Sequence, residues 1–268
     1  MAARLDDVLT LERIEAEAWA DFYLGLDRAV AARLKPAVER AEQHVAIRLT
    51  AVDAALMNRA VWLTGSDPSK SAAAVDASLR DFFDAHGVSD YRLAVAPALG
   101  HFDVEGFERV GEGWGKFRWP GGAPPPVETS LRIEEVGAEG REDFTRAVMV
   151  GFGLPELLRE WIGSLPGRAR WRSYVAYDRE TPVAAAASFI AGEGAWLGFG
   201  ATLPDARNKG AQGALLARRV ADALDAGATT IGVETGAPGP DGPGPSWRNI
   251  ERVGFELEYV RPNWRRVR

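Results

Sequence analysis

The residues best suited to chemistry lie around one turn in the second half of the chain. The apolar run 195–203 ends at Pro204, a polar turn follows, and a stretch rich in Ala and Leu begins at Ala211. This order predicts a strand, a turn and a helix. Basic and small residues occupy the turn and the helix start: Arg207, Lys209, Gly210 and Gly213. Because the first amides of a helix lack partners within it and carry partial positive charge, we expect this turn to bind a pyrophosphate group.

Two common phosphate-binding motifs do not fit the turn. In a Walker loop, a glycine is followed by Lys and then by Ser or Thr, whereas Lys209 is followed by Gly210. In a dinucleotide fingerprint, a third glycine would stand where this chain has Leu203, after Gly198 and Gly200. A nucleotide-phosphate enzyme of another fold is therefore disfavoured.

The turn resembles the Arg/Gln-x-x-Gly-x-Gly/Ala signature of the GCN5-related N-acetyltransferases. Arg207, Gly210 and the small residues after them match, whereas Gln212 stands at the usual last small position. The resemblance implies acetyl-CoA as the cofactor, with its diphosphate on the amides of the turn and its pantetheine arm on the strand before it. The cofactor-binding residues that it implies are Ala201, Thr202, Leu203, Arg207, Asn208, Lys209, Gly210, Ala211, Gln212, Gly213 and Ala214, with Asn249 as a further candidate on the pantetheine arm. The alternatives are that Arg207 and Lys209 are solvated residues of the helix start and that Asn249 belongs to a helix surface.

The composition is typical of a soluble globular protein and excludes several classes of function. Of the 268 residues, 46% are hydrophobic and 26% are charged, and the net charge is −6. A broad nucleic-acid-binding surface is not expected on such an acidic chain. With no cysteine and only three histidines, all in the first half, no metal site is expected. No run is apolar enough to span a bilayer and the start of the chain is acidic, so we expect a cytoplasmic protein without a membrane partner.

A segment rich in proline and glycine divides the chain. Residues 120–126 read Pro-Gly-Gly-Ala-Pro-Pro-Pro, which suits neither a helix nor the interior of a sheet. We therefore expect a first domain over residues 1–120, a linker over 121–127 and a second domain over 128–268.

The second domain has the pattern of a mixed α/β (α+β) fold. Apolar runs and turn residues predict the order β-α-α-β-β-β-α-β-α-β between about residues 128 and 265. The acetyltransferase family has this order, its cofactor loop lies where the turn after Pro204 is, and the late Gly254-Phe255 pair also agrees. The resemblance implies a mixed, mostly antiparallel sheet flanked by helices in each of two tandem domains.

The first domain is expected to be a degenerate copy of the second. Apolar residues at every fourth position predict one helix over 11–34, and a strand, turn, helix, strand and Gly-Phe pair follow as in the second half. Residues 67–71, Asp-Pro-Ser-Lys-Ser, occupy the place of the cofactor loop. With an acid and without glycines, this loop is not expected to bind a diphosphate. Two unrelated α/β domains are the alternative.

Two residues are candidates for catalysis. Transfer of an acetyl group from a thioester needs an unprotonated amine and a stabilised oxyanion. Glu234, near the end of the strand after the cofactor helix, is the best-placed carboxylate for a base, and an ordinary strand-end acid is the alternative. Many family members have a tyrosine as proton donor where this chain has Ile250. Tyr259 is a second donor candidate, or else a core aromatic.

The sequence thus predicts an acetyl-CoA-dependent N-acetyltransferase that acts on the primary amine of a small molecule or peptide. Polyamines, aminoglycosides, amino acids and protein lysines are all compatible acceptors. The alternative is a non-catalytic CoA-binding or sensor protein with the same fold, which the absence of the usual tyrosine favours.

Overall fold

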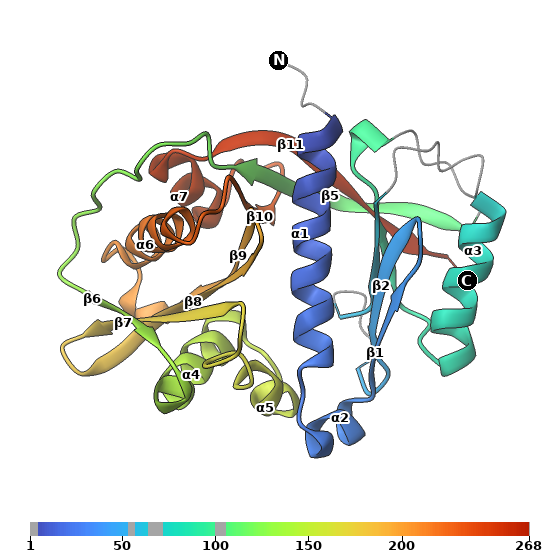
Figure 1. Cartoon of the computed structure of the whole chain (residues 1–268), viewed down its shortest axis with the longest axis horizontal. Coiled ribbons are helices and arrows are strands. Elements are labelled where there is room, and N and C mark those ends of the chain that lie inside the picture. Colours follow the sequence, from blue (N-terminus) through green and yellow to red (C-terminus); the bar gives the residue numbers. More distant parts are fainter. Residues whose placement is uncertain (1–4, 53–56, 64–71, 100–105, 268) are drawn as a thin grey trace. The chain divides into compact units, whose positions relative to one another are not determined.

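The computed structural model describes residues 5–52, 57–63, 72–99 and 106–267 (Figure 1). The chain forms two compact units. Unit 1 consists of Met1–Lys116, Gly236–Gly242 and Glu258–Arg268, and unit 2 consists of Phe117–Thr235 and Pro243–Leu257. The first division falls close to the expected linker. The end of the chain returns to unit 1, however, which a boundary drawn along the sequence does not anticipate.

Unit 1 combines a long first helix with a mixed sheet. Its helices are α1 (Leu5–Leu24), α2 (Arg28–Leu34) and α3 (Ala72–Phe83), with short 3₁₀ turns η2 (Asp84–His86) and η3 (Pro97–Leu99). Its strands are β1 (Pro36–Arg40), β2 (His44–Leu49), β3 (Arg59–Trp62), β4 (Arg92–Ala94), β5 (Phe107–Arg118) and β11 (Glu256–Arg266). They lie in the order β1-β2-β3-β4-β11-β5. The pairs β1–β2, β2–β3 and β4–β11 are antiparallel, and β3–β4 is parallel.

The single helix predicted over residues 11–34 is two helices in the structure. α1 ends at Leu24, and Asp27 begins a new helix by accepting hydrogen bonds from the amides of Ala29 and Val30, both at 2.9 Å. Aspartate is among the strongest N-caps because its carboxylate satisfies amides that have no partner in the helix. The prediction was wrong because the apolar period continues across the break.

Unit 2 contains the predicted turn. Its helices are α4 (Arg141–Phe152), α5 (Arg159–Ile162), α6 (Ala211–Asp225) and α7 (Pro245–Val253), with 3₁₀ turns η4 (Ala138–Gly140), η5 (Glu156–Leu158) and η6 (Pro204–Ala206). Its strands are β6 (Arg132–Val136), β7 (Trp171–Asp178), β8 (Thr181–Ala191), β9 (Gly194–Thr202) and β10 (Thr230–Gly236), in the order β10-β9-β8-β7-β6. β9–β10 is parallel, and the pairs from β6 to β9 are antiparallel. The predicted mixed, mostly antiparallel sheet flanked by helices is confirmed.

The sheet of unit 2 lies between two helical layers, with α6 and α7 on one side and α4 and α5 on the other (Figure 1). Because successive side chains of β7 point to opposite faces of the sheet, this strand forms hydrogen bonds with both helical layers. Tyr174 donates a hydrogen bond to Asp222 of α6 at 2.8 Å, whereas Tyr177, on the opposite face, donates one to Asp143 of α4 at 2.9 Å. The small side chains of residues 184–187 in β8 let the helices approach the sheet closely.

The two units share an order of strand pairs. In each, antiparallel pairs lead to a parallel pair whose strands are joined through a helix, β3–α3–β4 in unit 1 and β9–α6–β10 in unit 2. The loop at residues 67–71, on which the expected loss of a cofactor site depends, lies outside the described residues. The tandem arrangement with a degenerate first half therefore stays a prediction.

Candidate functional site

The site begins where β9 and β10 stop pairing. Leu197 and Val233 form the last pair of their parallel register. β9 nevertheless continues to Thr202, and β10 continues to Gly236. Over this last part, β9 pairs with β8 on one side, and no other described strand pairs with its second edge. Backbone donors and acceptors on such an edge can bind an extended ligand.

A β-bulge lies just past this point. Between Gly198 and Ala201, two residues of β9 stand opposite a single residue of β8. The first of them, Phe199, has a φ of 55°, which a bulky residue rarely adopts. At the second, Gly200, an added Cβ would lie 2.9 Å from Oε1 of Gln212, so a side chain there would displace the end of Gln212. Bulges turn backbone groups out of the ladder and are frequent beside active sites.

The start of α6 supplies unpaired amides. Gly210 is its N-cap, with a φ of 79°, and no side chain caps the helix. The first helical amide with a backbone acceptor is that of Ala214, which donates to Gly210 O at 3.0 Å. Within the described ranges, the amides of Ala211, Gln212 and Gly213 have no partner. Together with the helix dipole, these donors favour an anion.

These features line one groove with a volume of about 1050 Å³. Its walls come from the extended segment 125–128, the end of α4 at 151–152, β9 at 200–202, the turn at 206–208, the start of α6 at 210–213, and Pro245, Ser246, Asn249, Arg252 and Val253 of α7. Arg207 and Arg252 are exposed cations, and Glu128 is the lining carboxylate. Ligand sites typically enclose roughly 300–1,000 Å³, so the groove has room for a large cofactor.

Most of the expected cofactor-binding residues meet in this groove. They are Ala201, Thr202, Arg207, Asn208, Gly210, Ala211, Gln212, Gly213 and Asn249. The structure thus brings α7, which comes much later in the sequence, beside β9 and the turn that follows it.

Solved structures share this architecture over nearly the whole chain. A GCN5-related N-acetyltransferase from Kribbella flavida matches with a TM-score of 0.64 at 20% identity, over 90% of this chain and 94% of its own. Another from Sphaerobacter thermophilus matches with a TM-score of 0.57 at 14% identity, over 99% of this chain and 94% of its own. No protein-family model and no curated protein matches the sequence. The chain has the fold of the GCN5-related N-acetyltransferases.

Three residues expected on the cofactor do not line the groove of this acetyltransferase fold. The amide of Leu203 donates to Val183 O at 2.9 Å, and its side chain packs on the core. Lys209 directs its ammonium group to Asp178, with Nζ 2.6 Å from Oδ2. Ala214 is buried, and its amide is used by the helix. Their positions are explained by bonds within unit 2.

The glycines of the turn have a packing role that the sequence did not reveal. An added Cβ at Gly210 would lie 2.9 Å from Glu128 O, and one at Gly213 would lie 3.2 Å from Cγ1 of Val127. Thr129 also donates a hydrogen bond to Lys209 O at 2.8 Å. The segment expected to be a linker therefore passes closely over the turn and forms part of the groove wall.

Gln212, at the position where the family signature has a small residue, connects α6 to β9. Its Nε2 donates a hydrogen bond to Oγ1 of Thr202 at 2.8 Å. Since both residues line the groove, this bond fixes the start of α6 relative to the open strand edge.

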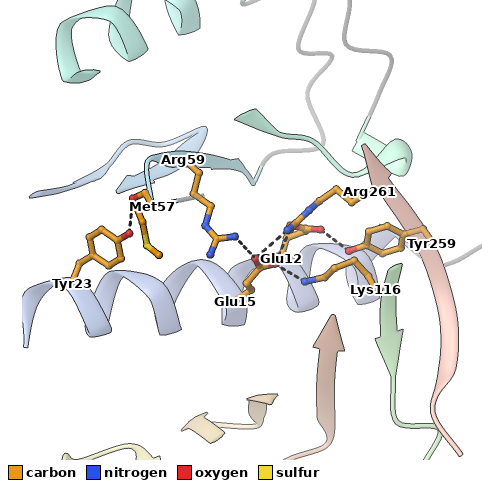
Figure 2. Close-up of polar contacts among 8 residues, drawn as sticks. All are labelled: Glu12, Glu15, Tyr23, Met57, Arg59, Lys116, Tyr259 and Arg261. Carbon is orange, nitrogen blue, oxygen red and sulfur yellow. Dashed lines mark hydrogen bonds and ion pairs between the residues drawn. The ribbon is translucent and has the colours of Figure 1, made fainter. Parts of the chain in front are cut away.

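The two catalytic candidates lie in different units. Glu234 follows Val233, the last residue of β10 paired with β9, so it stands at the strand separation in unit 2 and is partly buried. Tyr259 belongs to unit 1, and neither candidate is among the residues that line the groove. Its hydroxyl donates a hydrogen bond to Oε1 of Glu12 at 2.7 Å (Figure 2). Burial and this carboxylate raise the pKa of Tyr259, which makes it a poor acid.

At the usual tyrosine position, Ile250 is buried on α7. The described part of the groove lining accordingly contains no tyrosine.

Several lining residues were missed by the sequence analysis, among them Phe152, Ser246 and Arg252. Arg252 follows Asn249 by one helical turn, and Nη1 of Arg252 donates to Oδ1 of Asn249 at 2.7 Å. This spacing was a usable signal, because residues three apart share a helix face. Ser246 lies in the first turn of α7, after the N-cap Gly244.

Among the described residues, no helix combines the length and the apolar character needed to cross a bilayer. No cluster of three or more of their His, Asp and Glu side chains is arranged to hold a metal ion.

Proposed function

We propose that unit 2 binds acetyl-CoA in the groove and transfers its acetyl group to a primary amine. One observation carries this proposal: the uncapped amides of α6 and the open edge of β9 line the same groove. The first suits a diphosphate and the second suits an extended arm that contains amides. A CoA molecule has both groups in one chain.

The groove residues divide into two binding roles. The amides of residues 211–213 and the cations Arg207 and Arg252 would hold the diphosphate, because backbone donors and guanidinium groups both bind phosphate oxygens well. The backbone of residues 200–202 would hold the pantetheine arm, and Asn249 stands across from it on α7. Binding in this way orders the thioester for attack.

The reaction needs few groups from the protein. The acceptor nitrogen attacks the thioester carbonyl carbon, a carbon–nitrogen bond forms, the carbon–sulfur bond breaks, and CoA leaves as its thiolate. One proton moves from the nitrogen to a base, and the sulfur takes up a proton. Glu234, at the strand separation, is our candidate for that base, directly or through water.

A tyrosine acid is not essential to this proposal. The thiol of a cysteine has an ordinary pKa of about 8.5, whereas an alcohol is a far weaker acid, so a thiolate can leave without a proton donor beside it. Position 250 has an isoleucine, and the hydroxyl of Tyr259 is already bonded to Glu12, so neither residue supplies a proton donor. The lack of a donor slows transfer from a thioester less than it would slow a reaction with an alkoxide leaving group.

The same two residues favour a second candidate, a CoA-binding or sensor protein without turnover. Thiol release from acetyl-CoA separates the two functions. The assay would offer spermidine, kanamycin, free amino acids and a lysine peptide in turn. We expect release with at least one of them and a rate at least tenfold lower in Glu234→Gln. Stoichiometric CoA binding without release from any amine would favour the sensor.

Binding is tested by titrating CoA into the protein. Because Arg207 and Arg252 are exposed, the double variant Arg207→Glu/Arg252→Glu should fold normally and bind CoA about 100-fold more weakly, at about tenfold for each reversed charge. The matched control is Arg248→Glu, an exposed position on α7 outside the groove lining. Equal affinity in the double variant and the control would contradict the proposal.

Stoichiometry tests the role of unit 1. We propose that unit 1 has no cofactor site, so the titration should give one CoA per chain. Two sites of equal affinity would contradict this part of the proposal and leave the groove of unit 2 unaffected.

A further inference from the structure

Helix α6, which begins at the groove, also contains a buried charge that no acid among the described residues neutralises. Arg219 of α6 is 2% exposed. Its partners are three carbonyl oxygens: Leu215 O receives Nε at 3.0 Å, and Ala187 O and Gly198 O each receive Nη1 at 3.1 Å. Among the described side chains, no carboxylate pairs with it. Buried arginines without an acidic partner are rare, because removing the charge from water is costly.

The guanidinium group of Arg219 lies next to the β-bulge. Ala187 and Gly198 form the last regular pair of β8 and β9 before the bulge. One guanidinium nitrogen thus bonds to both strands at the point where their ladder is interrupted. An added Cβ at Gly200, in the bulge, would lie 3.8 Å from Nη2 of Arg219. Within the described ranges, no hydrogen bond involves Nη2.

A structural role alone accounts poorly for this arrangement. An aliphatic side chain at position 219 would fill the space between α6 and the sheet without burying a charge, and such replacements are often neutral or stabilising. Burial lowers the pKa of Arg219 to about 10, so the guanidinium is still charged near neutral pH. A positive charge held at this place is useful where negative charge develops during a reaction.

We infer that Arg219 is a positioning residue for acyl transfer: it fixes the β9 bulge against the groove and favours the oxyanion that forms there. This inference rests on the proposed function. Gly200 and Ala201 line the groove at the open edge of β9, where the thioester arm would lie. A bulge held by bonds to both strands would present the same backbone groups to every bound thioester.

Three variants test the inference. Arg219→Met removes the charge and the bonds to both strands at similar length, and Arg219→Lys keeps the charge but loses the planar fork. The matched control is Arg218→Met, the adjacent residue on α6, whose half-exposed side chain pairs with Asp222 at 2.8 Å. We expect kcat to fall tenfold or more in Arg219→Met, with the KM for acetyl-CoA within threefold of its starting value. Arg219→Lys should recover part of kcat, and Arg218→Met should leave it unchanged.

A second readout does not depend on turnover. The infrared band of the thioester carbonyl is recorded for bound acetyl-CoA labelled with ¹³C at that carbon. A carbonyl polarised at the bulge absorbs at lower frequency, so we expect the shift on binding to shrink in Arg219→Met and to persist in Arg218→Met. An unchanged band and kcat in Arg219→Met, with acetyl-CoA still bound, would overturn the inference and leave the proposed function in place. Failure of the unchanged protein to bind acetyl-CoA would overturn both.

Discussion

The two units bury charge in opposite ways. In unit 1, Glu12 and Glu15 of α1 are fully buried, and cations and a hydroxyl surround them (Figure 2). Glu15 accepts hydrogen bonds from Arg261 at 2.7 and 3.0 Å and from Lys116 at 2.5 Å, and Glu12 accepts from Arg261 and Tyr259. These cations hold the pKa of Glu15 well below its usual range, although burial alone would raise it.

In unit 2, the main polar groups near the groove have no such partners in the described chain. Arg219 bonds only to carbonyl oxygens, and the first amides of α6 have no acceptor. Polar groups that are satisfied internally stabilise one structure, whereas unsatisfied donors beside a groove indicate that a ligand completes them. The comparison therefore favours a stabilising role for the charges of unit 1 and supports the ligand site proposed for the groove of unit 2.

The largest expected effect concerns the network of unit 1. Glu15→Gln leaves Arg261, Lys116 and the nearby Arg59 without their main counter-charge, so we expect unit 1 to lose about 3–5 kcal/mol in its free energy of unfolding. The measurement is urea unfolding followed by hydrogen exchange of α1 amides. Glu17→Gln is the control on the same helix, because its pair with Arg40 is exposed and should contribute less than about 1 kcal/mol. Equal losses would show that the buried contacts do not stabilise unit 1.

Acid should remove the same stabilisation in the unchanged protein. The pKa of Glu15 is lower in the folded than in the unfolded chain, so the unfolded chain takes up the proton first as the pH falls. This contribution is complete above the ordinary pKa of about 4.5 and decreases below it, toward the folded value. We expect the unchanged protein to lose stability more steeply than Glu15→Gln below pH 4.5. Parallel curves for the two proteins would contradict the assignment.

A smaller effect is expected at the link between α6 and β9 in unit 2. The bond between Gln212 and Thr202 is partly buried and joins neutral groups, which typically contribute about 0.5–1.5 kcal/mol. A double-mutant cycle with Gln212→Ala and Thr202→Val should give a coupling energy of that size in urea unfolding. Strictly additive losses would show that the bond does not fix the start of α6.

The core of the site was predictable from sequence because local patterns encode it. The strand predicted over 195–203 is β9, Gly194–Thr202, and the predicted helix begins at Ala211. Proline, glycine and a change of apolar period mark these limits within a few residues. The unpaired amides at the start of α6 can be predicted once the first residue of the helix is known.

The remaining features depend on contacts between distant segments. The composition of residues 120–126 excludes helix and strand, but it does not show that the following residues pass over the turn. The sequence could not show that the hydroxyl of Tyr259 bonds to Glu12, which lies 247 positions away. Arg219 was missed, although it lies four residues after the apolar Leu215 on the same face of the helix.

The smallest expected effect concerns Lys209, in the turn of unit 2. It tests whether this charge is paired within the protein, as the buried charges of unit 1 are, and not with a ligand. Lys209 was expected on the cofactor, but its ammonium group pairs with Asp178 and does not line the groove. Lys209→Ala should therefore change the Kd for CoA by less than about twofold, whereas Arg207→Ala should raise it severalfold. Asp178→Asn provides the control, because it frees the ammonium group without removing it. Tighter CoA binding in Asp178→Asn, with weaker binding in Lys209→Ala, would make Lys209 a phosphate ligand that Asp178 competes for.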